Sequence, residues 1–266
     1  MIGVVNLIIL GATGGAILIL PIWMIHLRTG NAAIVDVGWA GGLALLGVLY
    51  ALLGQGYWLR SALIGTMAAI WGLRLAIYLS TRIIGHPEEG RYQELRRQWK
   101  TNIRFKFLLF FEFQALLCVV LSVPFLVAAT NSNPAMTALE WAAVAVWLIA
   151  MVGESAADAQ LNSFKANPAN KGRTCQVGLW RYSRHPNYFF EWLVWVAFAM
   201  FAAPAPNGLW GSASPLLILY FVLRVTGIPA TEAQAIRTRG EEYRRYQRTT
   251  SAFVPWFPKT IPQEKT

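Results

Sequence analysis

Long apolar stretches with almost no charge recur along this chain, and they constrain the fold more than any other feature of the sequence. A helix crosses the hydrocarbon core of a bilayer with about 20 residues, because each residue adds about 1.5 Å. The first five stretches have that length, and the last two are shorter but are flanked by residues typical of interfacial turns. The stretches cover residues 4–25, 34–53, 62–80, 107–130, 138–157, 188–203 and 216–225.

The composition supports this interpretation. The chain has 266 residues, of which 56% are hydrophobic and only 14% are charged, so a soluble domain of this size would expose much of its apolar surface. We therefore predict an all-α, polytopic membrane protein that crosses the bilayer about seven times. A cleaved signal peptide is the alternative for the first stretch, but no basic segment precedes it and no small-residue cleavage site follows it.

The positive charges predict the orientation of the chain. The net charge is +10, and Lys and Arg gather in alternate loops: around Arg28, within 82–106, within 165–184 and after residue 236. By the positive-inside rule, the N-terminus is expected outside and the C-terminus in the cytosol. Most of these basic residues are expected only to set topology and to contact anionic membrane lipid. They are split among membrane loops without a recognisable nucleic-acid-binding module, so no nucleic acid partner is expected.

The two cysteines indicate neither a disulfide framework nor a metal site. Cys118 lies in the middle of a predicted span, and Cys175 lies in a basic loop. This arrangement leaves the redox compartment undetermined, and we expect no metal ligand set.

Charged residues inside the predicted spans are the most informative ones, because each costs a few kcal/mol at the centre of a helix unless it faces the bundle interior or a wet cavity. Arg74 and Tyr78 are four residues apart, so a helix places them on one face. Glu154, Asp158 and Lys165 also share a face. The pattern predicts a polar cavity between helices. The alternative is that Asp36, at the start of the second span, forms a buried ion pair with Arg74 that only holds helices together.

The segment 178–192 reads GLWRYSRHPNYFFEW, a cationic and aromatic loop that leads through Pro186 directly into an apolar helix. Such a loop suits phosphate. Arginine binds phosphate oxygens through two parallel hydrogen bonds, a helix N-terminus adds unpaired N–H groups, and Tyr or His can contact a nucleotide. The loop therefore predicts an anion-binding site on the cytosolic side.

With these motifs the chain resembles the steroid 5α-reductase-like membrane enzymes, and within them a bacterial group of unassigned function that carries a VDVGWA-like early motif. The resemblance is strongest in the C-terminal half, through the RYSRHPNY loop and the tail TEAQAIRTRGEEYRRYQRTTSAFVPWFP. The same half is similar to sterol reductases and isoprenylcysteine carboxyl methyltransferases. The resemblance implies an integral membrane enzyme, in a bacterial inner membrane, with its active site toward the cytosol.

The resemblance also implies roles for individual residues. Asp158 corresponds to the acid that ends the fifth span of the reductases, and Arg74 and Tyr78 correspond to an Arg and Tyr pair of the third span. We expect Tyr78 to be the donor to the substrate carbonyl, with Asp36 as the acid or orienting group beside it and Tyr50 as a second candidate donor. The predicted cofactor-binding set is Arg74, Glu154, Asp158, Asn162, Lys165, Arg173, Arg181, Tyr182, Arg184, His185, Asn187, Tyr188, Glu191, Arg224 and Glu232.

Three positions depart from the reductase pattern. Asp36 stands alone where the steroid reductases have a Gln and Glu pair, Trp71 replaces a Tyr, and Glu232 replaces a Tyr of the tail. These differences preserve the expectation of a nucleotide cofactor but weaken that of a steroid. We expect one membrane domain over residues 1–266, with a substrate side in 1–106 and a cofactor side in 107–266.

The resulting expectation is an NADPH-dependent reductase that transfers hydride to the carbon–carbon double bond of an enone-like steroid or isoprenoid lipid. The main alternative is a methyltransferase that uses S-adenosylmethionine on a lipid or prenylcysteine-type acceptor. The N-terminal residues Asp36, Arg74 and Tyr78 favour the reductase, because a minimal methyltransferase does not need them. A non-catalytic lipid-binding or transport protein would leave the cationic loop without a purpose.

Overall fold

The computed structural model describes residues 3–259, and these fold as helices joined by short loops. Within this range the only strand-like pairing is an isolated bridge between Ser183 and Ser251. Six helical segments are long and apolar enough to cross a membrane, which confirms the predicted multi-pass helical membrane protein. The six segments are Val4–Thr29, Ile34–Leu53, Trp58–Ile83, Ile103–Ala129, Ala138–Ala166 and Gly208–Arg239.

The remaining predicted span falls on α8 (Pro186–Ala202), which is 17 residues long. That length is slightly below the roughly 20 residues that cross hydrocarbon without tilt or thinning of the bilayer. The count of seven spans and the orientation of the termini therefore stay predictions.

The chain divides into two compact units, and each unit takes two separate parts of the sequence. The first unit combines Met1–Trp141 with Phe198–Ser214, and the second combines Ala142–Ala197 with Pro215–Thr266. The boundaries fall within α7 (Ala138–Ala166), α8 and α9 (Ala213–Tyr220). The expected division after residue 106 into a substrate side and a cofactor side stays a prediction.

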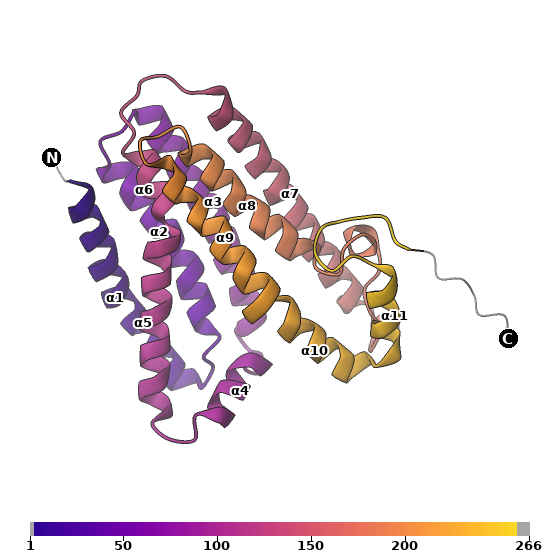
Figure 1. Ribbon diagram of the computed structural model, residues 1–266. Coiled ribbons are helices and arrows are strands. Elements are labelled where there is room, and N and C mark those ends of the chain that lie inside the picture. Colours follow the sequence, from indigo (N-terminus) through magenta and orange to yellow (C-terminus); the bar gives the residue numbers. More distant parts are fainter. Residues whose placement is uncertain (1–2, 260–266) are drawn as a thin grey trace. The chain divides into compact units, whose positions relative to one another are not determined.

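The first unit is built on α1, α2, α3 and α5, with a short polar helix and two short helical segments between and after them. Figure 1 shows α1, α2 and α5 side by side. The close approach of α2 and α3 requires glycine: a Cβ at Gly72 would lie 2.7 Å from the carbonyl oxygen of Ala40. The elements are α1 (Val4–Thr29), α2 (Ile34–Leu53), α3 (Trp58–Ile83), α4 (Gly90–Gln98), α5 (Ile103–Leu121), α6 (Val123–Ala129) and η3 (Gly208–Ser212).

The second unit contains most of α7 and α8 and the C-terminal helices. Gly153 on α7 lies directly against the ring of Phe190 on α8, so a larger residue at position 153 would force these helices apart. The π-helical turn η4 (Phe221–Val225) follows α9 and leads into α10 (Ile228–Arg239) and α11 (Glu241–Thr249). Two short 3₁₀ turns, η1 (Pro168–Asn170) and η2 (Gly178–Arg181), shape the loop between α7 and α8.

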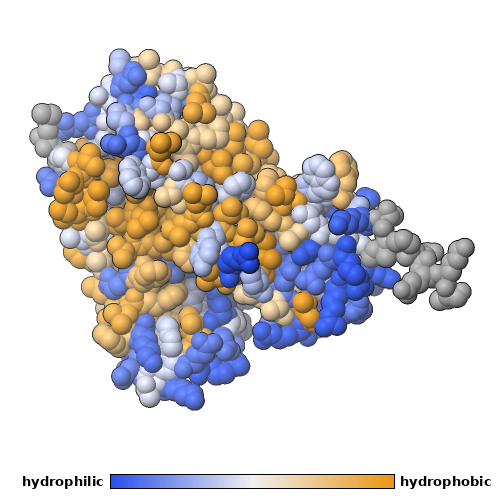
Figure 2. Space-filling view, viewed as in Figure 1, coloured by the Kyte–Doolittle hydropathy of each residue, from blue (hydrophilic) through white to orange (hydrophobic). Residues whose placement is uncertain are grey.

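The surface of the helices is apolar where a soluble protein would be polar. Figure 2 shows hydrophobic side chains over the visible face of α1 and α5, and hydrophilic side chains gathered around α4. Large exposed side chains on these helices include Ile17, Leu109 and Leu116. This pattern fits helices that face lipid tails and a polar α4 that lies outside the hydrocarbon.

A buried ion pair ties α3 to the start of α7 within the first unit. The guanidinium of Arg60 contacts the carboxylate of Glu140, and both side chains are almost completely buried. Arg60 also donates to the carbonyl oxygens of Asn131 (3.0 Å), Asn133 (2.7 Å) and Ala135 (2.7 Å). The side chain of Arg60 therefore fixes the backbone of the loop that precedes α7.

Glu140 has a second role at the N-terminus of α7. Its carboxylate accepts from the backbone N–H of Thr137 (2.7 Å), and the Thr137 hydroxyl accepts from the N–H of Glu140 (3.3 Å). This reciprocal pattern is the capping box, which satisfies helix N–H groups that have no intrahelical acceptor. The same carboxylate therefore caps α7 and neutralises the buried Arg60.

We expect Glu140→Gln to lower the free energy of unfolding by about 3–5 kcal/mol, because it leaves the buried guanidinium of Arg60 without a counter-charge. Denaturant titration in detergent measures this change. The matched control is Glu94→Gln, whose partner Arg97 is 76% exposed, and it should cost less than about 1 kcal/mol. Equal, small effects of the two variants would contradict a stabilising role for the Arg60–Glu140 ion pair.

Candidate functional site

Asp36, the predicted acid of α2, is held by α4. The hydroxyl of Tyr92 donates to Asp36 Oδ1 at 2.8 Å, and the guanidinium of Arg91 forms an ion pair with Oδ2. Both carboxylate oxygens therefore have partners on α4. The sequence predicted Arg74 as the ion-pair partner, or Tyr78 as the donor that Asp36 orients. In the structure Asp36 is instead paired with Arg91 and hydrogen-bonded to Tyr92, because α4 lies against the first turn of α2.

A second carboxylate fixes the same contact. Glu88, just before α4, accepts from the backbone N–H of Ala32 (2.7 Å) and from Arg96 Nε (2.8 Å). Arg96 also donates to the carbonyl oxygen of Gly30 (2.9 Å). Tyr92 is almost fully buried, and burial together with the neighbouring Asp36 charge raises its pKa well above the usual value. Tyr92 therefore keeps its proton and stays a hydrogen-bond donor to Asp36.

Arg74 and Tyr78 share a face of α3, as their spacing predicted. The guanidinium carbon of Arg74 lies 6.0 Å from the ring centroid of Tyr78, and that of Arg82 lies 5.8 Å from the same ring. The Tyr78 ring is thus within cation–π distance of one arginine on each side along the helix. This environment favours an aromatic side chain at position 78, and the catalytic role expected of Tyr78 stays a prediction.

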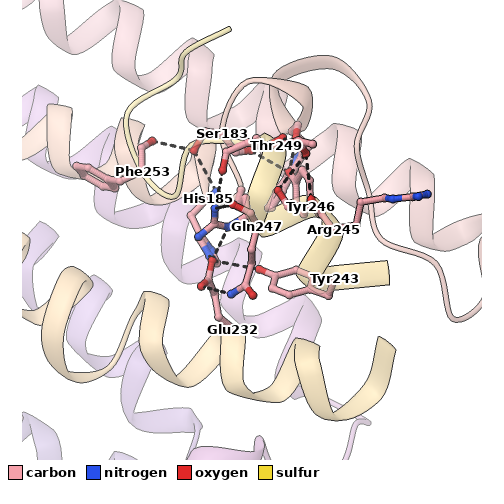
Figure 3. A network of polar contacts seen from close by, with 12 residues as sticks. Ser183, His185, Glu232, Tyr243, Arg245, Tyr246, Gln247, Thr249 and Phe253 are labelled. Atoms are coloured by element: carbon pink, nitrogen blue, oxygen red, sulfur yellow. Dashed lines mark hydrogen bonds and ion pairs between the residues drawn. The ribbon is translucent and has the colours of Figure 1, made fainter. Parts of the chain in front are cut away.

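In the second unit, the carboxylate of Glu232 on α10 is the centre of a polar network (Figure 3). Glu232 Oε1 accepts from Arg184 Nε at 2.6 Å and contacts His185 Nε2 at 3.2 Å. Gln247 on α11 donates to Oε2 at 2.7 Å, and Tyr243 donates to Oε1 at 3.4 Å. Four side chains from the loop and from α11 therefore converge on one carboxylate.

The loop before α8 is fixed to the tail by further bonds. The hydroxyl of Ser183 donates to the carbonyl oxygen of Phe253 at 2.7 Å. The backbone N–H of Arg184 donates to the carbonyl oxygen of Ser251 at 2.8 Å. The buried hydroxyl of Tyr246 donates to the carbonyl oxygens of Trp180 and Ser183. The RYSRHPNY segment is therefore ordered by α10, α11 and the chain that follows them.

Burial lowers the pKa of His185, and the contact with Glu232 opposes this shift only in part. His185 is therefore neutral near pH 7 and donates to Glu232 from Nε2, which corresponds to one tautomer of the ring. Its ring stacks on that of Tyr188, with centroids 5.3 Å apart. The Tyr188 hydroxyl contacts that of Thr231 at 3.1 Å.

The structure brings some predicted cofactor residues together in the second unit and leaves others on its surface. Asn187 donates to Asp158 at 3.4 Å, which joins α8 to α7, and Glu191 accepts from Trp195 at 3.0 Å. Glu154 and Asp158 are buried. Exposed side chains are Asn162, Lys165, Arg173, Arg181, Tyr182 and Arg224.

This distribution separates two roles within the predicted set. Arg184, His185 and Glu232 are bound to one another and shape the loop, so their first contribution is structural. Arg173 precedes η2 and Arg181 is its last residue, and both side chains are exposed. Their guanidinium groups therefore face solvent, unlike that of Arg184, which is paired with Glu232.

Sequence reasoning missed Arg91, Tyr92, Tyr243 and Gln247. It treated 82–106 as a basic loop, although Tyr92, Leu95 and Trp99 recur at helical spacing and predict an apolar face. Tyr243 and Tyr246 are likewise three residues apart in EEYRRYQ, a spacing that places two aromatic rings on one face.

Comparison with known proteins bears on these sites. Residues 22–250 match a family described as "Protein of unknown function (DUF1295)". The chain belongs to this family. DUF1295 is a steroid 5α-reductase-like membrane family, which agrees with the resemblance at the level of the family but assigns no activity.

One similar protein is the uncharacterized protein C594.04c of Schizosaccharomyces pombe, which is 27% identical over 216 residues. The alignment covers 71% of this chain and 62% of the relative, so the chain spans less than two thirds of that protein. No solved structure matches the chain.

We expect Glu232→Gln to lower the free energy of unfolding by about 2–3 kcal/mol, because charge-assisted hydrogen bonds to Arg184 and His185 are weakened. The matched control is Glu241→Gln in an exposed pair with Arg248, which should leave the free energy of unfolding nearly unchanged because water screens this pair. Denaturant titration in detergent compares them. A Glu232→Gln protein with parental stability but weaker nucleotide binding would contradict the structural role and favour direct cofactor contact.

Proposed function

We propose that this DUF1295 protein is an NADPH-dependent membrane reductase that acts on the carbon–carbon double bond of an enone-like steroid or isoprenoid lipid. When bound, NADPH would supply the hydride that adds to the β-carbon of the enone. The electron pair of the double bond then moves toward the carbonyl oxygen, and a proton from the protein or from water adds at the α-carbon. The products are the saturated ketone and NADP⁺.

The observation that carries the proposal is the ordered loop before α8. Its shape is fixed by the Glu232 network, while Arg173 and Arg181 remain exposed beside it. A preorganised loop with accessible guanidinium groups fits the pyrophosphate of a dinucleotide, and the surplus of cations fits the additional 2′-phosphate of NADPH. The first turn of α8, at Pro186, adds N–H groups without intrahelical acceptors.

The first unit offers groups that suit the substrate carbonyl. Tyr78 provides a hydroxyl on a largely apolar helix, where a preorganised donor can stabilise a developing enolate oxygen by several kcal/mol. In our proposal Tyr78 is the donor, and Asp36 acts with its partner Tyr92 rather than directly on Tyr78. The apolar surface of these helices suits a substrate that reaches the enzyme from the bilayer.

The proposal includes the finer membrane topology. We infer seven spans, with α8 as the short one, an outside N-terminus and a cytosolic C-terminus. Localisation in a bacterial inner membrane, with the cofactor loop toward the cytosol, follows from the resemblance and from the positive-inside rule.

An S-adenosylmethionine-dependent methyltransferase is the second candidate, because the loop of the second unit would also suit that cofactor. The Arg74–Tyr78 contact and the Asp36–Tyr92 hydrogen bond of the first unit favour the reductase. Methyl transfer to a lipid nucleophile gives no role to a carbonyl-polarising tyrosine.

The test is turnover, measured as NADPH oxidation with a panel of enone steroids and isoprenoid ketones. On an accepted substrate, Tyr78→Phe should lower the turnover rate roughly tenfold or more with little change in cofactor affinity, because it removes a transition-state interaction. Tyr220→Phe, at an exposed tyrosine of α9, is the matched control. Asp36→Asn should lower turnover if Asp36 is catalytic, and should lower only stability if it merely anchors α4. Parental turnover of Tyr78→Phe would refute the assigned role.

A further inference from the structure

A cavity of about 390 Å³ lies in the C-terminal chain, outside the predicted cofactor set. It is lined by α11 and the segment that follows, which folds back on itself. The backbone N–H of Lys259 donates to the carbonyl oxygen of Thr249 at 2.8 Å, so the two ends of the 249–259 loop meet. The N–H of Trp256 donates to the carbonyl oxygen of Tyr182 at 2.9 Å, which fixes the loop on the second unit.

The polar lining of this cavity suits an anion. The residues that line it include the cationic Arg248 and Lys259 and three residues with hydroxyl groups, Thr249, Thr250 and Ser251. The lining residues that the structure describes include no carboxylate. Glu241 lies nearby and pairs with Arg248 at 2.7 Å, but both side chains of this pair are more than half exposed, so a phosphate can compete for the guanidinium.

The rim of the cavity is apolar and exposed. Trp256 and Phe257 expose 70% and 76% of their surface, and Val254 exposes 51%. Exposed aromatic residues beside cations are typical of the membrane–water interface, where rings enter the headgroup layer and cations meet phosphate. A soluble anion would use the cations and hydroxyls but would give this apolar rim no function.

We propose that the cavity lined by residues 247–259 binds the phosphate headgroup of an anionic membrane phospholipid. Arg248 and Lys259 contact the phosphate, the hydroxyls donate to its oxygens, and the apolar rim contacts the glycerol and the start of the acyl chains. The charge beside the cavity agrees with an anionic rather than a zwitterionic lipid, because Arg244 on α11 is exposed as well. The site does not depend on the proposed reductase activity.

The experiment uses the full chain in a neutral detergent and titrates short-chain phosphatidylglycerol, phosphatidylcholine, glycerol phosphate and NADPH, with binding followed by calorimetry. We expect phosphatidylglycerol to bind at least tenfold more tightly than phosphatidylcholine or glycerol phosphate. The double variant Arg248→Gln/Lys259→Gln should weaken phosphatidylglycerol binding at least tenfold. The charge-preserving variant Arg248→Lys/Lys259→Arg should retain binding, which separates loss of charge from misfolding.

The matched control is Arg237→Gln/Arg245→Gln, which removes the same charge from two exposed tail positions outside the cavity and should change affinity less than twofold. In Figure 3 Arg245 points away from the polar network. Trp256→Ala/Phe257→Ala should weaken phosphatidylglycerol binding and leave glycerol phosphate unaffected.

Three results would overturn the proposal. Equal losses in the cavity variant and the control variant would indicate unspecific electrostatic attraction. Equal affinity for glycerol phosphate and phosphatidylglycerol would indicate a site for soluble anions. Competition between NADPH and phosphatidylglycerol that the cavity variant abolishes would assign the cavity to the cofactor.

Discussion

This structure depends on one constraint: charged side chains that are withdrawn from water, within the protein or beside the lipid, need a partner of opposite charge. A carboxylate or guanidinium that leaves water without a partner costs several kcal/mol, so each such group needs a counter-charge and hydrogen bonds. Glu140 meets Arg60, Asp36 meets Arg91, and Glu232 meets Arg184. The partners of these three pairs are 80, 55 and 48 residues apart in sequence, respectively. Each contact therefore also holds distant elements of one unit together.

The three pairs differ in how completely the protein encloses them. Arg60 and Glu140 are fully enclosed and have backbone partners at the end of the loop, so they form a clasp. Asp36 and Glu232 lie in partly exposed clusters with tyrosine and histidine beside them.

The sequence was sufficient to predict the helical membrane fold, because long apolar runs have few alternatives in a chain with this little charge. It also predicted the shared face of Arg74 and Tyr78, since helical spacing alone determines it. It could not predict that α4 would supply the partners of Asp36, because that contact depends on how a short polar helix packs on α2. The Glu232 network was hidden for the same reason: Arg184 and Gln247 are distant in sequence and become neighbours only through the tail. Glu140 was overlooked, although Thr137 three residues before it forms a recognisable capping pattern.

Equilibrium binding of nucleotides to the purified protein tests the central claim most directly. Calorimetry in detergent compares NADPH, NADH and S-adenosylmethionine, with Arg181→Gln as the variant of an exposed loop cation. The proposed function predicts that NADPH binds about tenfold or more tightly than NADH, because the 2′-phosphate gains a charge-assisted contact, and that Arg181→Gln reduces this preference. It predicts no saturable binding of S-adenosylmethionine. Binding of S-adenosylmethionine without binding of NADPH would contradict the reductase and favour the methyltransferase.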